Sequence, residues 1–325
     1  MVEEGEAGTL ENPLDSYTRS ILFQDRGKYS FSSQEKRDFE RSSISFADHL
    51  MRLHGLKPPD KKIWRTFPYS GKGMLSILDI LLRTIRSGHW VLMERRRVRE
   101  NPQRPRIALL QDISGSIGNS GITRGTVLLC LALLELFGRG FAREFVLSTI
   151  GGSFTPVEYL RCQPKEGKRY ILDQIYNKVG TMPSPVFETL ERNRFFDGKL
   201  GKLIFVVTDG LCEVYRRGWK DESATLTEFS NLLRVITNQI ENRTDTVLFW
   251  IQIGRYAKFE DFVKYALDYN PSTEPRNDKQ RLGQTFYRFF QNQSFLFINF
   301  QQLMNGAIFH KLITYLFDRF RMKFT

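Results

Sequence analysis

The sequence predicts an α/β fold: a doubly wound, mostly parallel open sheet flanked by helices, preceded by an N-terminal helical extension. Two apolar runs, residues 106–112 and 202–209, are bounded by polar residues, and each ends in a carboxylate. Runs of this kind are typical of strands buried on both faces of a parallel sheet. Between and after them, apolar strand patterns alternate with helical patterns, which is the order an open α/β fold requires.

The remaining elements follow from apolar periodicity along the chain. We expect an extended arm over residues 1–30, then helices over 33–56, 73–85, 126–137, 168–179, 185–193, 223–241, 259–269 and 301–320, and strands over 144–150, 157–162, 246–254 and 295–300. Residues 1–95 are expected to be an arm and helical extension that packs on the main domain. That domain is expected to span residues 96–325, with a polar insertion around 270–294.

Composition indicates a globular protein with acidic partners. Of the 325 residues, 41% are hydrophobic and 13% aromatic, enough to bury a sizeable core. The formal net charge is +12, which favours a nucleic acid, an anionic surface or an acidic protein as partner.

The cysteines and the apolar runs indicate the cellular compartment in which we expect the protein. Cys130, Cys162 and Cys212 each lie in an apolar stretch, so we expect buried thiols in the cytoplasm or another reducing intracellular compartment. The acidic first residues lack the apolar segment of a secretory signal. The most apolar run, residues 127–134, is too short to span a bilayer, so no membrane span is expected.

Oxygen-bearing side chains gather where the two strongest strands end. Asp112, Ser114 and Ser116 occupy alternate positions after the first strand, so in an extended turn their oxygens point to one side. Asp209 follows the second strand, and Thr181 lies in a loop between two helical segments. All five ligands are oxygens, which favours Mg²⁺ or Mn²⁺ with some water retained. The sequence therefore predicts a metal site at the carboxyl edge of the sheet.

The five positions resemble the metal-ion-dependent adhesion site (MIDAS) of the von Willebrand factor A (vWA) domain. The family motif is Asp-x-Ser-x-Ser, then Thr after Gly, then Asp usually followed by Gly. The resemblance implies a direct metal bond from each serine, a direct or water-mediated bond from Thr181, and aspartates that act mostly through bridging waters. In this chain Ile117 replaces a frequent Met, and Val-Gly-Thr replaces Gly-Gly-Thr. Neither change removes a ligand.

An arginine-rich segment precedes the first of these strands. It contains Arg95, Arg96, Arg97, Arg99 and Arg104. In this position the segment resembles the CoxE-like intracellular branch of the family, whose members are commonly linked with MoxR-type AAA+ ATPases. A solvated basic linker is the structural alternative. An acidic protein or nucleic-acid phosphates are the functional ones, because Arg pairs with both in a bidentate manner.

The sequence favours a binding protein over an enzyme. Ser114 stands where aspartate phosphatases place their general acid, no Gly-rich phosphate loop is present, and the four histidines lack metal or triad spacing. We therefore expect neither catalytic nor organic-cofactor-binding residues, and a metal-dependent hydrolase is the less favoured reading. The preferred function is an intracellular adaptor whose metal captures an acidic residue of a partner, either a MoxR-type AAA+ ATPase or its client. The alternative is an RNA-binding vWA protein that uses residues 95–106.

Overall fold

The computed structural model describes most of the chain. The described residues are 30–53, 62–68, 74–75, 77, 80, 82, 93–99, 105–119, 122–152, 155–198, 200–210, 212–216, 218–241, 243, 245–254, 259–292 and 295–299. The predicted arm up to residue 29 and the predicted helix over 301–320 lie outside them. The chain divides into two compact units, a larger one of residues 1–56 with 105–325 and a smaller one of residues 57–104.

The larger unit contains a six-stranded sheet that confirms the predicted fold class. Its strands are β4 (Arg106–Asp112), β5 (Glu144–Ile150), β6 (Leu160–Cys162), β7 (Lys202–Thr208), β10 (Thr246–Gly254) and β11 (Phe295–Asn299). The spatial order is β11-β10-β7-β4-β5-β6, and every neighbouring pair is parallel except β5 with β6. Edge strand β6 alone runs antiparallel in this sheet.

The strand order reverses at β4. From β4 the chain adds β5 and β6 on one side, and then β7, β10 and β11 on the other. Open α/β sheets bind ligands outside the carboxyl ends of the strands at such a switch point. The register pairs Gln111 with Val207, so the strand ends at Asp112 and Thr208 lie next to each other. The predicted metal residues follow these two ends.

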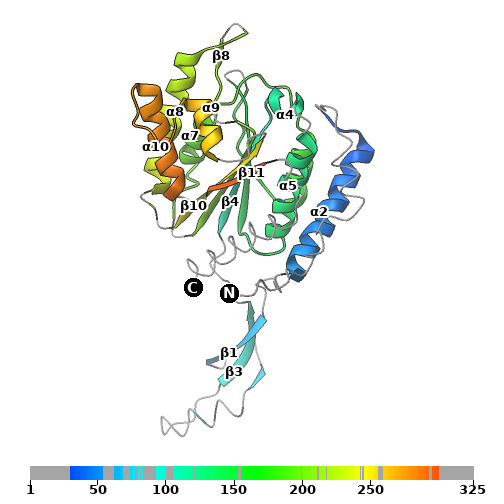
Figure 1. Ribbon diagram of the computed structural model, residues 1–325. Helices are drawn as coiled ribbons and strands as arrows, with labels where there is room; N and C mark the ends of the chain where they lie inside the picture. Colours follow the sequence, from blue (N-terminus) through cyan, green and yellow to red (C-terminus); the bar gives the residue numbers. More distant parts are fainter. Residues whose placement is uncertain are drawn as a thin grey trace, which may run out of the picture. The chain divides into compact units, whose positions relative to one another are not determined.

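Helices cover both faces of the sheet (Figure 1). Helices α2 (Ser33–Leu53), α5 (Thr123–Gly138) and α6 (Pro164–Leu172) contribute to one hydrophobic core, and α7 (Ser184–Arg192), α8 (Glu222–Ile236), α9 (Phe259–Leu267) and α10 (Asp278–Asn292) to the other. Helix α5 is buried almost all round because α2 packs against it from outside. The α2–α5 contact includes an ion pair between Glu35 and Arg124 at 2.7 Å.

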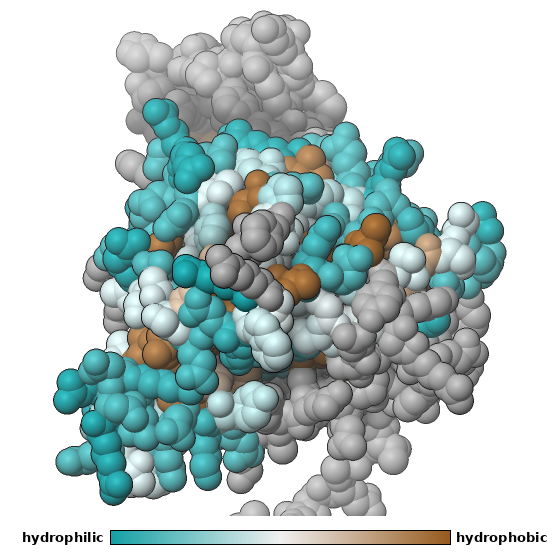
Figure 2. Space-filling view, turned by 90° about the horizontal axis from the view of Figure 1, so that it is seen from above, coloured by the Kyte–Doolittle hydropathy of each residue, from teal (hydrophilic) through white to brown (hydrophobic). Residues whose placement is uncertain are grey.

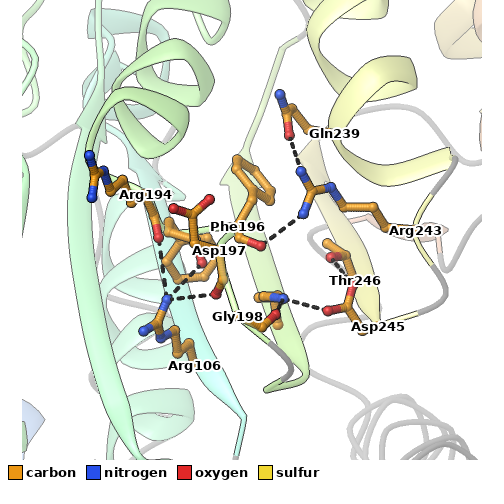
Figure 3. A network of polar contacts seen from close by, with 11 residues as sticks. Arg106, Arg194, Phe196, Asp197, Gly198, Gln239, Arg243, Asp245 and Thr246 are labelled. Carbon is orange, nitrogen blue, oxygen red and sulfur yellow. Dashed lines mark hydrogen bonds and ion pairs between the residues drawn. The ribbon is translucent and has the colours of Figure 1, made fainter.

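Two cations, the buried Lys202 and the half-buried Arg106, fix the amino ends of the central strands (Figure 3). Lys202 is fully buried, pairs with Asp245 and donates to the carbonyl of Gly198 at 2.7 Å. Arg106 Nη1 donates to three carbonyls of one loop, those of Arg194 (3.3 Å), Phe195 (3.2 Å) and Asp197 (3.1 Å). These bonds satisfy loop carbonyls that have no partner in a strand or helix.

Helix α10 corrects the predicted polar insertion around residues 270–294. The polar residues and prolines of this stretch suggested a loop, yet residues 278–292 form a helix. Asn277 caps it by accepting the Gln280 N–H at 2.8 Å. The apolar stripe of Phe286, Phe289 and Phe290 is buried, with Phe290 against Trp250 at a ring-centroid distance of 5.4 Å. Tertiary packing of a few aromatic residues outweighs the polar composition.

A second correction concerns the helix predicted over residues 168–179. Helix α6 begins at Pro164 and ends at Leu172. A capping box between Gln163 and Glu166, with proline at the first turn, starts the helix four residues earlier than predicted. Residues 175–181 are consequently free to form the loop that carries Thr181.

The smaller unit is a three-stranded antiparallel sheet. Strands β1 (Lys62–Pro68), β2 (Met74–Leu75) and β3 (Met93–Arg99) follow the order β1-β3-β2. Of the helix predicted over 73–85, the described residues 77, 80 and 82 are helical, whereas residues 74–75 form a strand. Residues 93–99 also form a strand, where a solvated basic linker is one of the alternatives that the sequence offers. The division also differs from the predicted boundary between residues 95 and 96, because β1 and β3 pair along their length.

The packing of α10 yields the first testable prediction. Phe286 is fully buried against Phe229 and Trp250, so Phe286→Ala is expected to lower the free energy of unfolding by about 3–5 kcal/mol. Arg288→Ala, at an exposed position of the same helix, is expected to change it by less than about 0.5 kcal/mol. Urea denaturation of both variants checks this. Equal, small effects would mean that α10 does not pack on the sheet.

Candidate metal centre

Asp112 anchors the loop after β4. Its carboxylate is fully buried. Oδ1 accepts the Ser114 N–H at 2.8 Å, and Oδ2 accepts the Thr208 hydroxyl at 2.6 Å. The two bonds join the loop after β4 to the end of β7, so Asp112 fixes the position of the serines that follow it.

Three hydroxyl and carboxylate oxygens form a chain above Asp112. Ser114 Oγ lies 2.9 Å from Ser116 Oγ, and Ser116 Oγ lies 3.0 Å from Asp209 Oδ1. Adjacent ligands of an octahedral Mg²⁺ ion, with metal–oxygen bonds of about 2.0–2.1 Å, are about 2.9 Å apart. The spacing of these oxygens therefore suits one small octahedral cation.

Thr181 reaches the same place from the loop between α6 and α7. Gly180 has a φ of 84°, and a Cβ there would lie 2.6 Å from the carbonyl oxygen of Glu213, so glycine is required. Thr181 and Glu213 exchange backbone hydrogen bonds of 2.8 and 2.9 Å. Thr181, Ser114 and Ser116 then line one cavity of about 370 Å³.

The structure thus brings the five predicted residues to one edge of the sheet. A further link comes from Gly115, whose N–H donates to the carbonyl of Lys178 at 2.8 Å and ties the serine loop to the Thr181 loop. That the five residues bind a metal stays a prediction.

The pKa values of both aspartates are raised, so the ionised form of each is disfavoured. Burial, with a further contribution from Glu213, raises the pKa of Asp112 from 3.8 to about 6. Burial and the neighbouring charge of Asp112 raise the pKa of Asp209 from 3.8 to about 8. A bound divalent cation would remove this penalty, because it favours the ionised form of both groups.

The donor set fits a hard cation. Among the described residues, no group of three or more His, Cys, Asp or Glu side chains is placed to hold a metal ion. Any metal here must therefore rely on the hydroxyls of Ser114, Ser116 and Thr181, with Asp112 and Asp209 close by. Oxygen ligands of this kind suit Mg²⁺ or Mn²⁺ and not Zn²⁺. Such an ion would supply a Lewis acid that attracts a carboxylate.

Glu213 is the residue of the site that sequence reasoning missed. It lines the cavity of Thr181 and also a neighbouring cavity of about 320 Å³. Lys220 Nζ pairs with its Oε1 at 2.8 Å, and the hydroxyl of Tyr215 donates to its Oε2 at 3.4 Å. No periodicity marks Glu213 in the sequence. Thr208, whose hydroxyl supports Asp112, directly precedes Asp209 in the sequence.

The neighbouring cavity extends the site away from the metal residues. Ser116 and Asp209 line it on one side, and Leu226, Phe262 and Lys279 belong to the rest of its wall. Tyr265, which also lines it, is 71% exposed, and Val179 of the first cavity is 64% exposed. Seen from above, this end of the molecule is mainly hydrophilic, with hydrophobic residues scattered near its middle (Figure 2).

The predicted basic residues belong to the smaller unit. Arg95, Arg96, Arg97 and Arg99 belong to β3 of the smaller unit, and Arg104 lies outside the described residues. Cys130, Cys162 and Cys212 are free and buried, as expected. In the part of the chain that the structure describes, no helix has both the length and the apolarity needed to cross a bilayer.

Comparison with known proteins gives weak overlaps with solved structures. No family model matches the chain, and no curated protein matches it. A von Willebrand factor type A protein from Catenulispora acidiphila shares 15% identity over 57% of this chain and 42% of its own length, with a TM-score of 0.35. The VWA domain of SpRpn10 shares 12% identity over 63% and 94%, with a TM-score of 0.37. The vWF domain of the pilus tip protein Mfa5 from Porphyromonas gingivalis shares 12% over 63% and 85%, with a TM-score of 0.30. The fold assignment accordingly rests on the strand order of the chain itself.

The raised pKa values predict how metal-free protein responds to pH. Because both folded-state pKa values exceed 3.8, the folded state binds protons more tightly, and stability falls as pH rises from about 4 through 6 and 8. Thermal melts in EDTA are expected to show a lower melting temperature at pH 8 than at pH 5.5. Asp209→Asn is expected to reduce this dependence. An equally steep decline in that variant would contradict the assignment.

Proposed function

We propose that this protein is a metal-dependent protein-interaction module. A Mg²⁺ or Mn²⁺ ion at Ser114, Ser116 and Thr181, with Asp112 and Asp209 behind it, would capture an acidic residue of a partner protein. The observation that carries the proposal is the chain of oxygens from Ser114 through Ser116 to Asp209, spaced at 2.9 and 3.0 Å.

The charge of the site explains the choice of an acidic residue. Both oxygens of Asp112 already accept hydrogen bonds, from the Ser114 N–H and the Thr208 hydroxyl, which spreads their charge into the protein. A cation held largely by neutral hydroxyls keeps most of its positive charge. A carboxylate from outside can then replace a bound water and complete the coordination.

The adjoining cavity favours a polypeptide over a lone carboxylate. Leu226, Phe262 and exposed Tyr265 offer apolar surface next to Ser116 and Asp209. A segment whose acidic residue binds the cation could place a neighbouring apolar side chain there. The resemblance of the motif to vWA domains supports the same reading, since that family generally mediates protein–protein interaction.

The arginine-rich segment suggests which partner the module serves. Its resemblance to the CoxE-like branch favours a MoxR-type AAA+ ATPase or a client of one, in an intracellular compartment. In this role the protein is an adaptor and leaves nucleotide hydrolysis to the ATPase. The partner assignment rests on the sequence resemblance alone.

A metal-dependent hydrolase is the less favoured function. Among the described residues that line the two cavities there is no histidine. Cys212 lines one of them, but burial raises the pKa of its thiol well above the ordinary value, which opposes a nucleophilic thiolate. Glu213 is engaged by Lys220 and Tyr215. The described walls therefore offer neither a histidine base nor an activated thiolate.

Metal binding can be tested with single hydroxyl deletions. Ser114→Ala and Thr181→Ala are each expected to weaken Mg²⁺ binding by roughly tenfold or more, because each removes an oxygen from the site. Thr285→Ala removes an exposed hydroxyl of α10 and serves as the matched control. Isothermal titration calorimetry measures all three. Unchanged affinity in both site variants would reject the metal centre.

Partner capture can be tested by selecting random peptides on the immobilised protein in Mg²⁺ and eluting with EDTA. Enriched peptides are expected to share an Asp or Glu, and its amide counterpart is expected not to bind. Mg²⁺ and peptide should each raise the affinity of the other by the same factor, as linkage requires. Peptides that remain bound in EDTA, or that tolerate loss of their acidic residue, would overturn the proposal while leaving metal binding itself intact.

A further inference from the structure

The smaller unit carries most of the net charge of the chain. Residues 57–104 contain twelve Lys and Arg against four Asp and Glu, a formal charge of +8 out of +12 for all 325 residues. None of the residues proposed to hold the metal belongs to this unit. The charge therefore calls for an explanation separate from the metal centre.

The register of β1 and β3 divides these charged residues between the two faces of the sheet. Lys62 of β1 lies opposite Arg99 of β3, and three further pairs follow at alternate positions: Trp64 with Arg97, Thr66 with Arg95, and Pro68 with Met93. Directly opposed residues share a face of an antiparallel sheet, and so do alternate residues along a strand. The basic face, defined in this way, consists of Lys62, Trp64, Thr66, Pro68, Met93, Arg95, Arg97 and Arg99, with Met74 of β2 opposite Arg95.

The other face has a different composition. The pairs of opposite parity are Ile63 with Val98, Arg65 with Arg96, and Phe67 with Glu94. This second face thus carries Ile63, Val98, Phe67 and the acidic Glu94, with Leu75 of β2 opposite Glu94. The basic face, at the described strand positions, contains no acidic residue to balance its cations.

Like charges in directly opposed positions destabilise a sheet. Lys62 with Arg99 is such a pair on the basic face, and Arg95, Arg97 and Arg99 form a row with a spacing of about 6.6 Å along one strand. A polyanion bound along this row would remove the repulsion. A regular row of cations suits a ligand whose charges also repeat regularly.

Trp64 favours single-stranded nucleic acid over other polyanions as the ligand. It lies opposite Arg97 and next to Lys62 on the same face, with Arg95 and Arg99 at the diagonal positions. Aromatic residues among cations are the pattern of single-stranded nucleic-acid binding, in which bases stack on the rings while the cations track the backbone. An acidic polypeptide would use the cations but has no need of the tryptophan.

We propose that the basic face binds single-stranded nucleic acid, with Arg95, Arg97, Arg99 and Lys62 as phosphate contacts and Trp64 as a stacking platform. This activity belongs to the smaller unit and does not depend on the metal centre. A protein with both would hold a polypeptide through one unit and a nucleic acid through the other.

The test is a fluorescence anisotropy titration of a fluorescein-labelled oligouridylate with the full chain, over a series of salt concentrations. The triple variant R95Q/R97Q/R99Q is expected to bind at least tenfold more weakly and to lower the log–log salt slope by about two, since each single-strand phosphate contact contributes about 0.7. The variant W64L is expected to bind about tenfold more weakly with an unchanged slope.

The matched control is R65Q/R96Q, which removes two cations from the opposite face. Its affinity is expected to fall less than that of the triple variant. Circular dichroism checks that each variant folds. If the triple variant does not fold, the single variants R97Q and W64L decide the question.

Three results would overturn the proposal: equal losses in control and triple variants, an unaffected W64L, or competition by polyglutamate as strong as by unlabelled oligouridylate. The last would assign the face to an acidic protein. A fourth result, loss of binding in EDTA, would place the nucleic acid at the metal centre and would also overturn the proposal.

Discussion

The carboxylate of Asp112 is fully buried at the end of β4, where the strand order reverses. It accepts hydrogen bonds from the Ser114 N–H and the Thr208 hydroxyl. The metal-site geometry depends on this arrangement. It positions the two serines, joins the loop after β4 to the end of β7, and brings one carboxylate close to a second one, Asp209. Burial, together with the neighbouring charge of Asp112, raises the pKa of Asp209. A divalent ion would favour the ionised form of both carboxylates, which is why the proposed function centres on a metal and not on proton transfer.

Much of the larger unit could be predicted from its sequence because its signals are local. The strands that end at Asp112 and Thr208 are continuous apolar runs, and parallel strands must place their carboxyl ends at one edge. Glu213 could not be predicted as part of the site, because a backbone pairing with Thr181 brings it there and no sequence pattern encodes that pairing. Helix α10 could not be predicted from the sequence for a related reason. Its polar surface dominates the composition, while its helical character comes from three phenylalanines that pack beneath Trp250 and α8.

The smaller unit also depends on a strand pairing that the sequence does not reveal. The arginines at positions 95–99 suggested a solvated linker, since charge runs rarely form strands. They form β3 because β1 supplies a partner strand about 30 residues earlier, and only the register reveals that Arg95, Arg97 and Arg99 share a face with Trp64. Sequence reasoning found the charge but could not find the tryptophan beside it. The two units thus offer chemically different surfaces, an all-oxygen centre in one and a cationic sheet face in the other.

The central claim is that Ser114 and Ser116 hold a divalent cation with a position left open for a partner. Anomalous diffraction from crystals grown with Mn²⁺ tests it most directly. The account predicts one strong peak at about 2.0–2.3 Å from the Oγ atoms of Ser114 and Ser116, with at least one coordinated water facing the cavity lined by Thr181. Absence of a peak at these serines in fully Mn²⁺-saturated crystals, or a cation enclosed by protein ligands on every side, would contradict it.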